Sequence, residues 1–328
     1  MKTLISNAIK LTFLSLVYLC LPGIGWSQSV SSDKKIHLIV PFPAGGGTDV
    51  PARLIASELA AKLGQTIVVE NRPGAAGNTG ADYVAKAAKD GTTLLIGTVN
   101  ITSINPLLYT GMTFDPARDL AAVSLLGIAP NVLVVSATSP IQNLSDLIGA
   151  AKRDPEKLTF ASAGSGTTLH LAGEMLKISA GISMTHVPYK GAPVALPDVI
   201  SGNVTTMFVA VPAALGLIKA GRLRPLAVSG LSRVPALKDV LTIDELGIKG
   251  FDAVAWHGVF VAAGTPPEVI SRLNTAIASV VGSAEIRAKL TELGIEAKLS
   301  TPQQLTDLAA ADKVKWARVV QQSGAKID

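Results

Sequence analysis

The sequence has little cysteine, few aromatic residues and few charges. Cys20 is the single cysteine among 328 residues, aromatic residues make up 4% of the chain, and Asp, Glu, Lys and Arg together make up 16%. A single cysteine excludes an intramolecular disulfide and a zinc site built from several thiolates. The four histidines show neither the HExxH nor the HxH spacing, which argues against a metal site. No block of Lys and Arg is present, so a nucleic-acid partner is not expected.

The first 27 residues have the three parts of a secretory signal peptide. Two lysines precede an apolar run over 11–21, and small residues follow it. The run is too short to cross a bilayer as a helix, which takes about 20 residues. A lipoprotein signal is the alternative, but bulky Leu19 stands where a small residue is needed before Cys20. We expect cleavage after Ser27 and a periplasmic location.

The mature chain has the size and composition of a two-lobed protein. Removing 27 of 328 residues leaves 301, and the formal charge becomes +3 because 27 basic residues face 24 acidic ones. This mild charge and the low charged fraction are typical of a well-packed α/β protein. The length exceeds that of one ordinary core and suits two.

Short β-branched segments alternate along the chain with segments of helical periodicity. Ile55, Leu59 and Leu63, for example, recur at the spacing of one helix face. The predicted strands are 36–40, 66–70, 93–98, 131–137, 158–163, 185–189, 205–211, 224–229 and 255–263. The predicted helices are 49–63, 77–88, 143–152, 168–180, 192–201, 265–281 (with Thr265 as N-cap) and 302–321. The early β-α-β-α-β order predicts a parallel sheet with right-handed crossovers.

Two crossings between sheets are expected, near 129–133 and near 250–256. They divide the mature chain into a first lobe, 28–131 plus 255–328, and a second lobe, 132–254. Two lobes joined by two crossing segments form a hinge, and a ligand cleft between them is the usual consequence.

The loop PFPAGGGTD at 41–49 follows a predicted strand and opens a predicted helix. Its three glycines allow a ligand to approach the backbone closely, and the free N–H groups of a helix start favour an anion. The Walker pattern is absent because no lysine follows the glycines, and the third glycine of the Rossmann fingerprint is missing. An ordinary glycine-rich turn capped by Thr48 or Asp49 is the alternative.

A second loop, AGSGTTLH at 163–170, repeats this arrangement of glycines, hydroxyls and a helix start. A serine close to a histidine raises the possibility of a hydrolase. The nucleophile-elbow pattern GxSxG is not met around Ser165, and no acid is placed to orient His170. We therefore expect a binding protein without enzymatic activity, in which His170 packs against or organises the loop.

Several segments together resemble one family. VPFPAGGGTDVPARLIA, ENRPGAAGNTG, FASAGSGTTLHLAGE and HVPYKGAPVALPDVISGNV occur in the order found in the substrate-binding receptors of tripartite tricarboxylate transporters, also called Bug receptors. The resemblance covers essentially the whole mature chain. It implies a periplasmic binding protein of the type II fold, in which two α/β lobes close like a Venus flytrap on a small carboxylate. It also implies that backbone groups and ordered water, and not an arginine clamp, hold the carboxylate. We expect no cofactor and no metal.

The resemblance also implies which residues contact the ligand. In the first lobe these are Phe42, Pro43, Ala44, Gly45, Gly46, Thr48, Asp49, Thr98 and Asn100. In the second lobe they are Ala163, Ser165, Gly166, Thr167, Thr168, His170, Tyr189 and Lys190. Many family members have an Asp where this chain has Val209, which leads us to expect a less polar ligand than an amino acid.

Three classes of function remain open. The first is a binding receptor, which by the resemblance would deliver a small carboxylate to the membrane subunits of a tripartite tricarboxylate-type transporter. The second is a receptor that presents its ligand to a sensor protein, and the third, less favoured, is a periplasmic hydrolase. In each case we expect the chain to act as a monomer.

Overall fold

The computed structural model describes residues 35–155 and 157–326. The expected signal peptide and its cleavage after Ser27 lie outside the described residues. Within these ranges the helices and strands gather around two separate sheets. We call each sheet with its helices a lobe.

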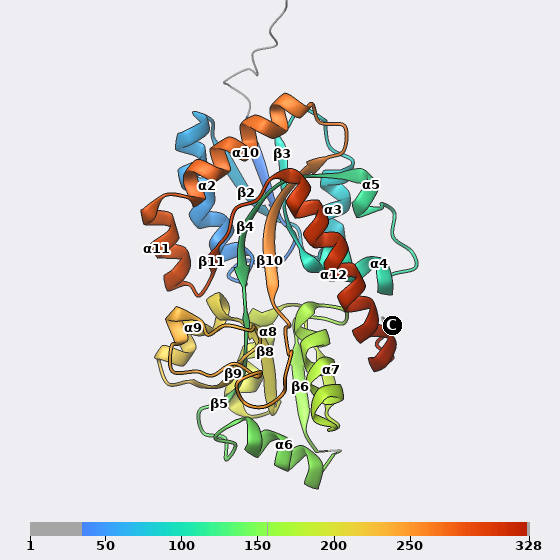
Figure 1. Ribbon diagram of the computed structural model, residues 1–328, viewed down its shortest axis with the longest axis vertical. Coiled ribbons are helices and arrows are strands. Elements are labelled where there is room, and N and C mark those ends of the chain that lie inside the picture. The colour runs from blue at the N-terminus through green and yellow to red at the C-terminus, as the bar shows by residue number, and fades with distance from the viewer. Residues whose placement is uncertain (1–34, 156, 327–328) are drawn as a thin grey trace, which may run out of the picture. The chain divides into compact units, whose positions relative to one another are not determined.

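The six-stranded sheet of the first lobe has the order β11-β4-β10-β3-β1-β2 (Figure 1). The strands are β1 Ile36–Val40, β2 Ile67–Asn71, β3 Thr93–Thr98, β4 Leu120–Ala129, β10 Ala255–Ala262 and β11 Glu296–Ala297. β1 is parallel to β2 and β3, as predicted. β10 is antiparallel to both of its neighbours, β3 and β4. Because β4 takes the chain out to the second lobe and β10 brings it back, the two must run in opposite directions.

Helices cover both faces of this sheet, and successive side chains of its strands point to opposite faces. Leu38 and Leu94 pack in a cluster with α2 (Asp49–Leu63) and α10 (Pro267–Val281). Ile39 and Leu95 belong to a different cluster, on the face where α3 and α12 contact the sheet. The remaining helices of this lobe are α3 Asn78–Ala85, α4 Asn105–Leu108, α5 Pro116–Asp119, α11 Ala284–Glu292 and α12 Pro302–Ser323, together with a π-helical turn η2 at Asn100–Ile104.

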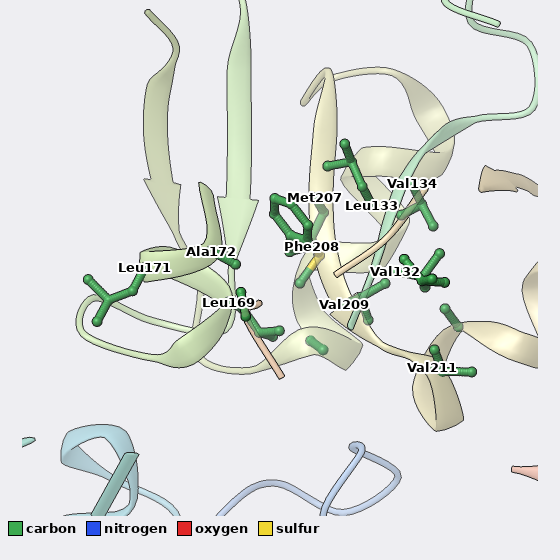
Figure 2. Packing of buried hydrophobic residues seen from close by; sticks show 14 of the residues in the cluster. Val132, Leu133, Val134, Leu169, Leu171, Ala172, Met207, Phe208, Val209 and Val211 are labelled. Atoms are coloured by element: carbon green, nitrogen blue, oxygen red, sulfur yellow. The ribbon is translucent and has the colours of Figure 1, made fainter. Parts of the chain in front are cut away.

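The five-stranded sheet of the second lobe has the order β7-β6-β8-β5-β9. Its strands are β5 Asn131–Ser136, β6 Thr159–Ser162, β7 Thr185–Pro188, β8 Thr206–Ala210 and β9 Leu223–Val228. Its helices are α6 Leu144–Arg153, α7 Thr168–Ala180, α8 Ala192–Ser201 and α9 Val211–Lys219. Figure 2 shows the core of this lobe, where side chains of β5 and β8 lie beside those of α7. β5 enters from the first lobe and is antiparallel to β8 and β9.

The chain passes between the sheets from β4 to β5 and again between β9 and β10. The sequence pattern did not predict β4, because its residues LAAVSLLGIA are buried on both faces and lack the alternation of a half-exposed strand. A second correction concerns the helix expected at 265–281. It begins at Pro267 with Pro266 as N-cap, because the hydroxyl of Thr265 donates to Ala262 O instead.

The C-terminal helix α12 starts at a Thr301 cap and contacts both lobes. Thr301 accepts from the Gln304 N–H while Gln304 accepts from the Thr301 N–H, which completes a capping box. The helix packs on β4 and reaches α7 of the second lobe (Figure 1). Among the described helices, α12 included, none is both long and apolar enough to span a membrane.

Candidate ligand-binding site

A cavity lies between the lobes where the carboxyl ends of the strands of both sheets face each other. It holds about 70 Å³, the space of roughly five to seven waters at about 10–15 Å³ each. It is lined by Phe42, Pro43, Gly46, Gly47, Thr48, Thr98, Asn100, Asn131, Ala163, Thr167, Thr168, Leu169, Gly191, Ala192, Pro193, Ala210, Ala255 and His257. Among these lining residues there is no Asp, Glu, Lys or Arg. A charged ligand would therefore have to be held by dipoles and hydrogen bonds.

Four helix N-termini meet at this cavity. α2 follows Thr48, α7 follows Thr167, α8 follows Gly191 and α9 follows Ala210, and all four of these N-cap residues line it. Within the described chain, the backbone N–H groups of Gly47 and Thr48 before α2 donate to no acceptor, and neither do those of Thr168 and Leu169 at the start of α7. Partial positive charge from these helix ends and unpaired N–H donors favour an anion.

The first glycine loop is held from behind by the buried carboxylate of Asp49. Its Oδ2 accepts from the Gly45 N–H and from Arg53 Nε, both at 2.9 Å, and its Oδ1 accepts from Asn71 Nδ2 at 2.8 Å. Burial raises the pKa of Asp49, but the hydrogen bonds from Arg53, Gly45 and Asn71 together lower it more, so the net pKa lies below its usual value. Asn71 also donates to Phe42 O at 3.0 Å. Asp49 thus orders the loop and does not line the cavity.

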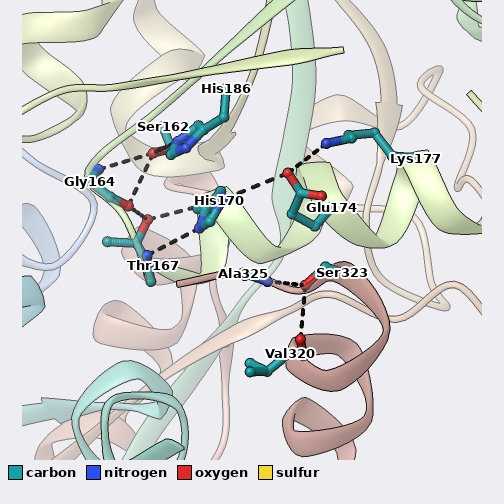
Figure 3. Close-up of polar contacts among 11 residues, drawn as sticks. Ser162, Gly164, Thr167, His170, Glu174, Lys177, His186, Val320, Ser323 and Ala325 are labelled. Carbon is teal, nitrogen blue, oxygen red and sulfur yellow. Dashed lines mark hydrogen bonds and ion pairs between the residues drawn. The ribbon is translucent and has the colours of Figure 1, made fainter. Parts of the chain in front are cut away.

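The second glycine loop is held by a buried serine and two stacked histidines (Figure 3). Ser162 Oγ accepts from the Gly164 N–H and lies 2.7 Å from His186 Nε2. His170 Nδ1 accepts from the Gly166 N–H at 3.1 Å. The two imidazole rings stack at 3.9 Å between centroids. His170 is therefore placed as an organiser of the loop.

Both histidines of this cluster are neutral. Burial, with smaller contributions from the positive charges of His186 and Lys177, lowers the pKa of His170 to about 3. Burial and the charge of Lys177 lower the pKa of His186 to about 4. Lys177 itself pairs with Glu174 at 2.9 Å (Figure 3). Neutral rings keep the Nδ1 of His170 available as an acceptor for the loop.

The two lobes touch directly across the cavity. Asn100 of the first lobe donates from Nδ2 to Gly166 O at 3.2 Å and accepts the hydroxyl of Thr168 at 3.0 Å. Gly47 lies so close to Ala210 that a Cβ added to the glycine would come within 2.5 Å of the alanine Cβ. These contacts describe a closed arrangement of the lobes.

The structure brings many of the expected contact residues to the cavity and places the others behind it. The lining includes the expected Phe42, Pro43, Gly46, Thr48, Thr98, Asn100, Ala163, Thr167 and Thr168. The lining does not include Ala44, Gly45, Asp49, Ser165, Gly166, His170, Tyr189 and Lys190. Several of these hold the loops, as described for Asp49 and His170. Tyr189 donates its hydroxyl to Asp198 at 2.6 Å, and this bond, with smaller contributions from burial and the negative charge of Asp198, raises the pKa of Tyr189 to about 12.

Other lining residues were not expected from the sequence: Gly47, Asn131, Leu169, Gly191, Ala192, Pro193, Ala210, Ala255 and His257. His257 is a single polar residue within an otherwise apolar strand, and Asn131 opens a strand whose next four residues are apolar. Both lie next to the predicted crossings, and this signal could have drawn attention to them. Val209, which we expected to tune the ligand, is buried in the core of the second lobe, whereas its neighbour Ala210 lines the cavity. Among the described residues, no group of three or more His, Cys, Asp and Glu is placed to hold a metal ion.

Comparison with known proteins places these features in a family. A family model described as the tripartite tricarboxylate transporter family receptor matches residues 51–325. The chain is 35% identical over 308 residues to protein BugT of Bordetella pertussis, a match that covers 92% of this chain and 94% of that protein.

Two solved structures are similar over nearly their whole length. A protein of R. palustris solved with adipate has 38% identity and a TM-score of 0.87, covering 89% of this chain and 98% of that one. MatC from Rhodopseudomonas palustris, solved with bound malate, has 31% identity and a TM-score of 0.82, covering 87% and 98%.

Proposed function

The chain belongs to the tripartite tricarboxylate transporter receptor family. From this premise we propose that it is a periplasmic receptor that captures a small carboxylate in the cavity between its lobes. The carrying observation is the meeting of four helix N-termini on a cavity that no charged side chain lines. Such a site stabilises a negative charge through backbone dipoles and N–H donors. The adipate and malate bound by two similar structures are both carboxylates.

We further propose which residues make direct contact. The carboxylate accepts from the unpaired N–H groups of the two glycine loops, at Gly47 and Thr48 on one side and Thr168 and Leu169 on the other. The expected contact residues that do not line the cavity act through the loops. Asp49 holds the first loop and His170 the second.

Closure of two lobes follows from contacts on both sides of the ligand. The proposed moving bodies are residues 35–130 with 255–326, and residues 131–155 with 157–254. The boundary lies one residue earlier than expected from the sequence, because Asn131 begins β5 of the second sheet. A ligand held by both glycine loops makes contacts in the closed form that the open form lacks, so it shifts the population to the closed form. The membrane subunits of a tripartite transporter then recognise the closed monomer and accept its carboxylate.

Thermal-shift measurements on the mature protein test this proposal. A ligand that binds only the folded state at 100 times its Kd stabilises it by about 2.7 kcal/mol, so a carboxylate that binds should raise Tm by several degrees. The panel should contain mono-, di- and hydroxycarboxylates, with the corresponding amines and neutral amides as controls. Thr168→Ala, which removes the bond to Asn100, should weaken binding without unfolding the protein. A panel in which amines raise Tm and no carboxylate does would refute the proposal.

A further inference from the structure

Three buried polar atoms of the cavity lining have no hydrogen-bond partner in the described chain. They are Thr98 Oγ1, Asn131 Oδ1 and His257 Nδ1. The exposed fractions of these residues are 3%, 0% and 4%. Buried polar side-chain atoms in folded proteins nearly always have a partner, and an unpaired one requires an explanation. Because all three residues line the cavity, a group of the bound ligand is the candidate for that partner.

Asn131 and His257 come from the strands that follow the two crossings, Thr98 comes from a strand paired with β10, and none of the three belongs to a glycine loop. Thr98 ends β3, and His257 lies directly opposite it on the antiparallel strand β10. Asn131 is the first residue of β5, opposite Ala210, which also lines the cavity. Residues opposite each other on paired strands are close neighbours. The cavity therefore has a second polar region, distinct from the helix N-termini that favour the carboxylate.

The orientation of the Asn131 amide is determined by its other contacts. Its Nδ2 donates to Ala253 O at 2.8 Å, and its backbone N–H donates to Ser229 Oγ at 3.0 Å. The unpaired Oδ1 is consequently an acceptor that requires a donor from the ligand. A carboxylate oxygen cannot supply one.

The two first-lobe atoms can each donate or accept. The hydroxyl of Thr98 does both, and His257 Nδ1 donates in one tautomer and accepts in the other. His257 Nε2 lies 3.3 Å from Thr48 Oγ1. Burial lowers the pKa of His257 to about 4, so the ring is neutral at neutral pH. This region thus combines a fixed acceptor with two adaptable neutral groups and has no positive charge for a second carboxylate.

We propose that Thr98, Asn131 and His257 form a neutral polar subsite that binds a hydroxyl or carboxamide group of the ligand. This inference rests on the proposed function, since it places the ligand's carboxylate at the helix N-termini. A hydroxyl or an amide both donates and accepts, so it can satisfy Asn131 Oδ1 together with the other two atoms. The preferred substrates are then monocarboxylates that carry a hydroxyl or an amide, and dicarboxylates are disfavoured.

Calorimetry with matched ligand pairs tests the subsite. The probes are lactate, 3-hydroxybutanoate, 4-hydroxybutanoate and 5-hydroxypentanoate, each with its unsubstituted parent acid, and succinate and glutarate as dicarboxylates. At least one hydroxy acid should bind about tenfold more tightly than its parent and than the dicarboxylate of similar length, as expected for one hydrogen bond to a buried group. The mature full-length protein is used throughout.

Three variants assign the preference to the subsite. Thr98→Val keeps the side-chain shape and removes an unpaired hydroxyl, so it should fold normally and lose most of the tenfold preference. Thr98→Ser retains the hydroxyl and should retain the preference. Thr206→Val is the matched control, because Thr206 is equally buried but donates to Val134 O at 2.8 Å within the second sheet. It should lower the stability of the fold and leave the preference unchanged.

The outcomes separate this inference from the function on which it rests. Parent acids that bind as tightly as every hydroxy acid, or a preference that survives in Thr98→Val, would overturn the subsite and leave carboxylate capture intact. Tighter binding of succinate or glutarate than of all hydroxy acids would also overturn it. Failure of every carboxylate to bind would overturn both proposals.

Discussion

Gly47 and Ala210 face each other from opposite lobes, so one added methyl group tests whether the lobes close on the ligand. Gly47 is not among the residues with positive φ, and its backbone therefore accepts alanine. The new Cβ would lie 2.5 Å from the Cβ of Ala210, whereas carbon atoms in contact prefer about 3.5–4.0 Å. We expect Gly47→Ala to hold the lobes about 1 Å or more further apart at this point.

The clash raises the free energy of the closed form only. Overpacking by one methyl group typically costs about 1–3 kcal/mol, and each 1.4 kcal/mol is tenfold in affinity. Gly47→Ala should therefore raise the Kd for a bound carboxylate by about 5- to 150-fold. The open form lacks the clash, so the urea midpoint of the ligand-free protein should change little.

Isothermal titration measures the predicted rise in Kd, and small-angle scattering of the liganded protein measures the predicted separation of the lobes. Ala210→Gly removes the opposing methyl, and the double variant Gly47→Ala/Ala210→Gly should recover most of the lost affinity. Gly216→Ala is the control, because a Cβ there meets no atom within 4 Å, and its affinity should equal that of the wild type. Wild-type affinity in Gly47→Ala would show that the liganded lobes do not approach as this structure describes.

Three further predictions follow from the contacts around the cavity. Asp49→Asn should lower the free energy of unfolding by about 2–4 kcal/mol and weaken carboxylate binding. All three groups around this carboxylate donate hydrogen bonds to it, so the NH2 group of an amide would face a donor. An unchanged urea midpoint would contradict this prediction. Asn100→Ala removes both cross-lobe hydrogen bonds of the closed form, so isothermal titration should show a higher Kd for a bound carboxylate, and an unchanged Kd would count against the contact. The pKa values of His170 and His186, about 3 and 4 in the fold, lie below the usual 6.5. Below about pH 6.5 these histidines bind protons in the unfolded chain but not in the folded one. The free energy of unfolding is therefore highest above about pH 6.5 and falls towards pH 4, by up to about 1.4 kcal/mol per pH unit for each histidine. A urea midpoint that stays constant from pH 7 to 5 would refute this.

Local pattern was sufficient where neighbours in sequence decide the structure. The helix expected at 168–180 has those bounds, because its start is marked by Thr167 and its end by Gly181 in a left-handed conformation. β1 and β3 were predicted from short apolar runs with their observed limits. Each glycine loop precedes a helix, as predicted; that the loops bind an anion stays a prediction.

Pattern failed where distant segments determine the environment of a residue. β4 is an apolar run of ten residues whose character as a strand depends on pairing with β10, more than 120 positions later. Asp49 has the sequence context of a helix-start acid near a ligand, yet Asn71 and Gly45 bind its carboxylate on the side away from the cavity. Both loops contain glycines and hydroxyl residues before a helix. In each loop, some residues line the cavity while others, such as Asp49 and His170, hold the loop backbone in place.

The amino-acid sequence by itself indicated the family, through segments that resemble its members, and predicted the two α/β lobes, through local periodicity. It also predicts an anion at the glycine loops, because each of them opens a helix. The tertiary structure alone decided that Asn131 and His257 reach the cavity and leave polar atoms unpaired there. These residues belong to the strands that follow the two crossings between the lobes, and only the pairing of β10 with β3 brings His257 beside Thr98. An unsatisfied hydrogen bond is a property of three-dimensional surroundings, so no local pattern can reveal it.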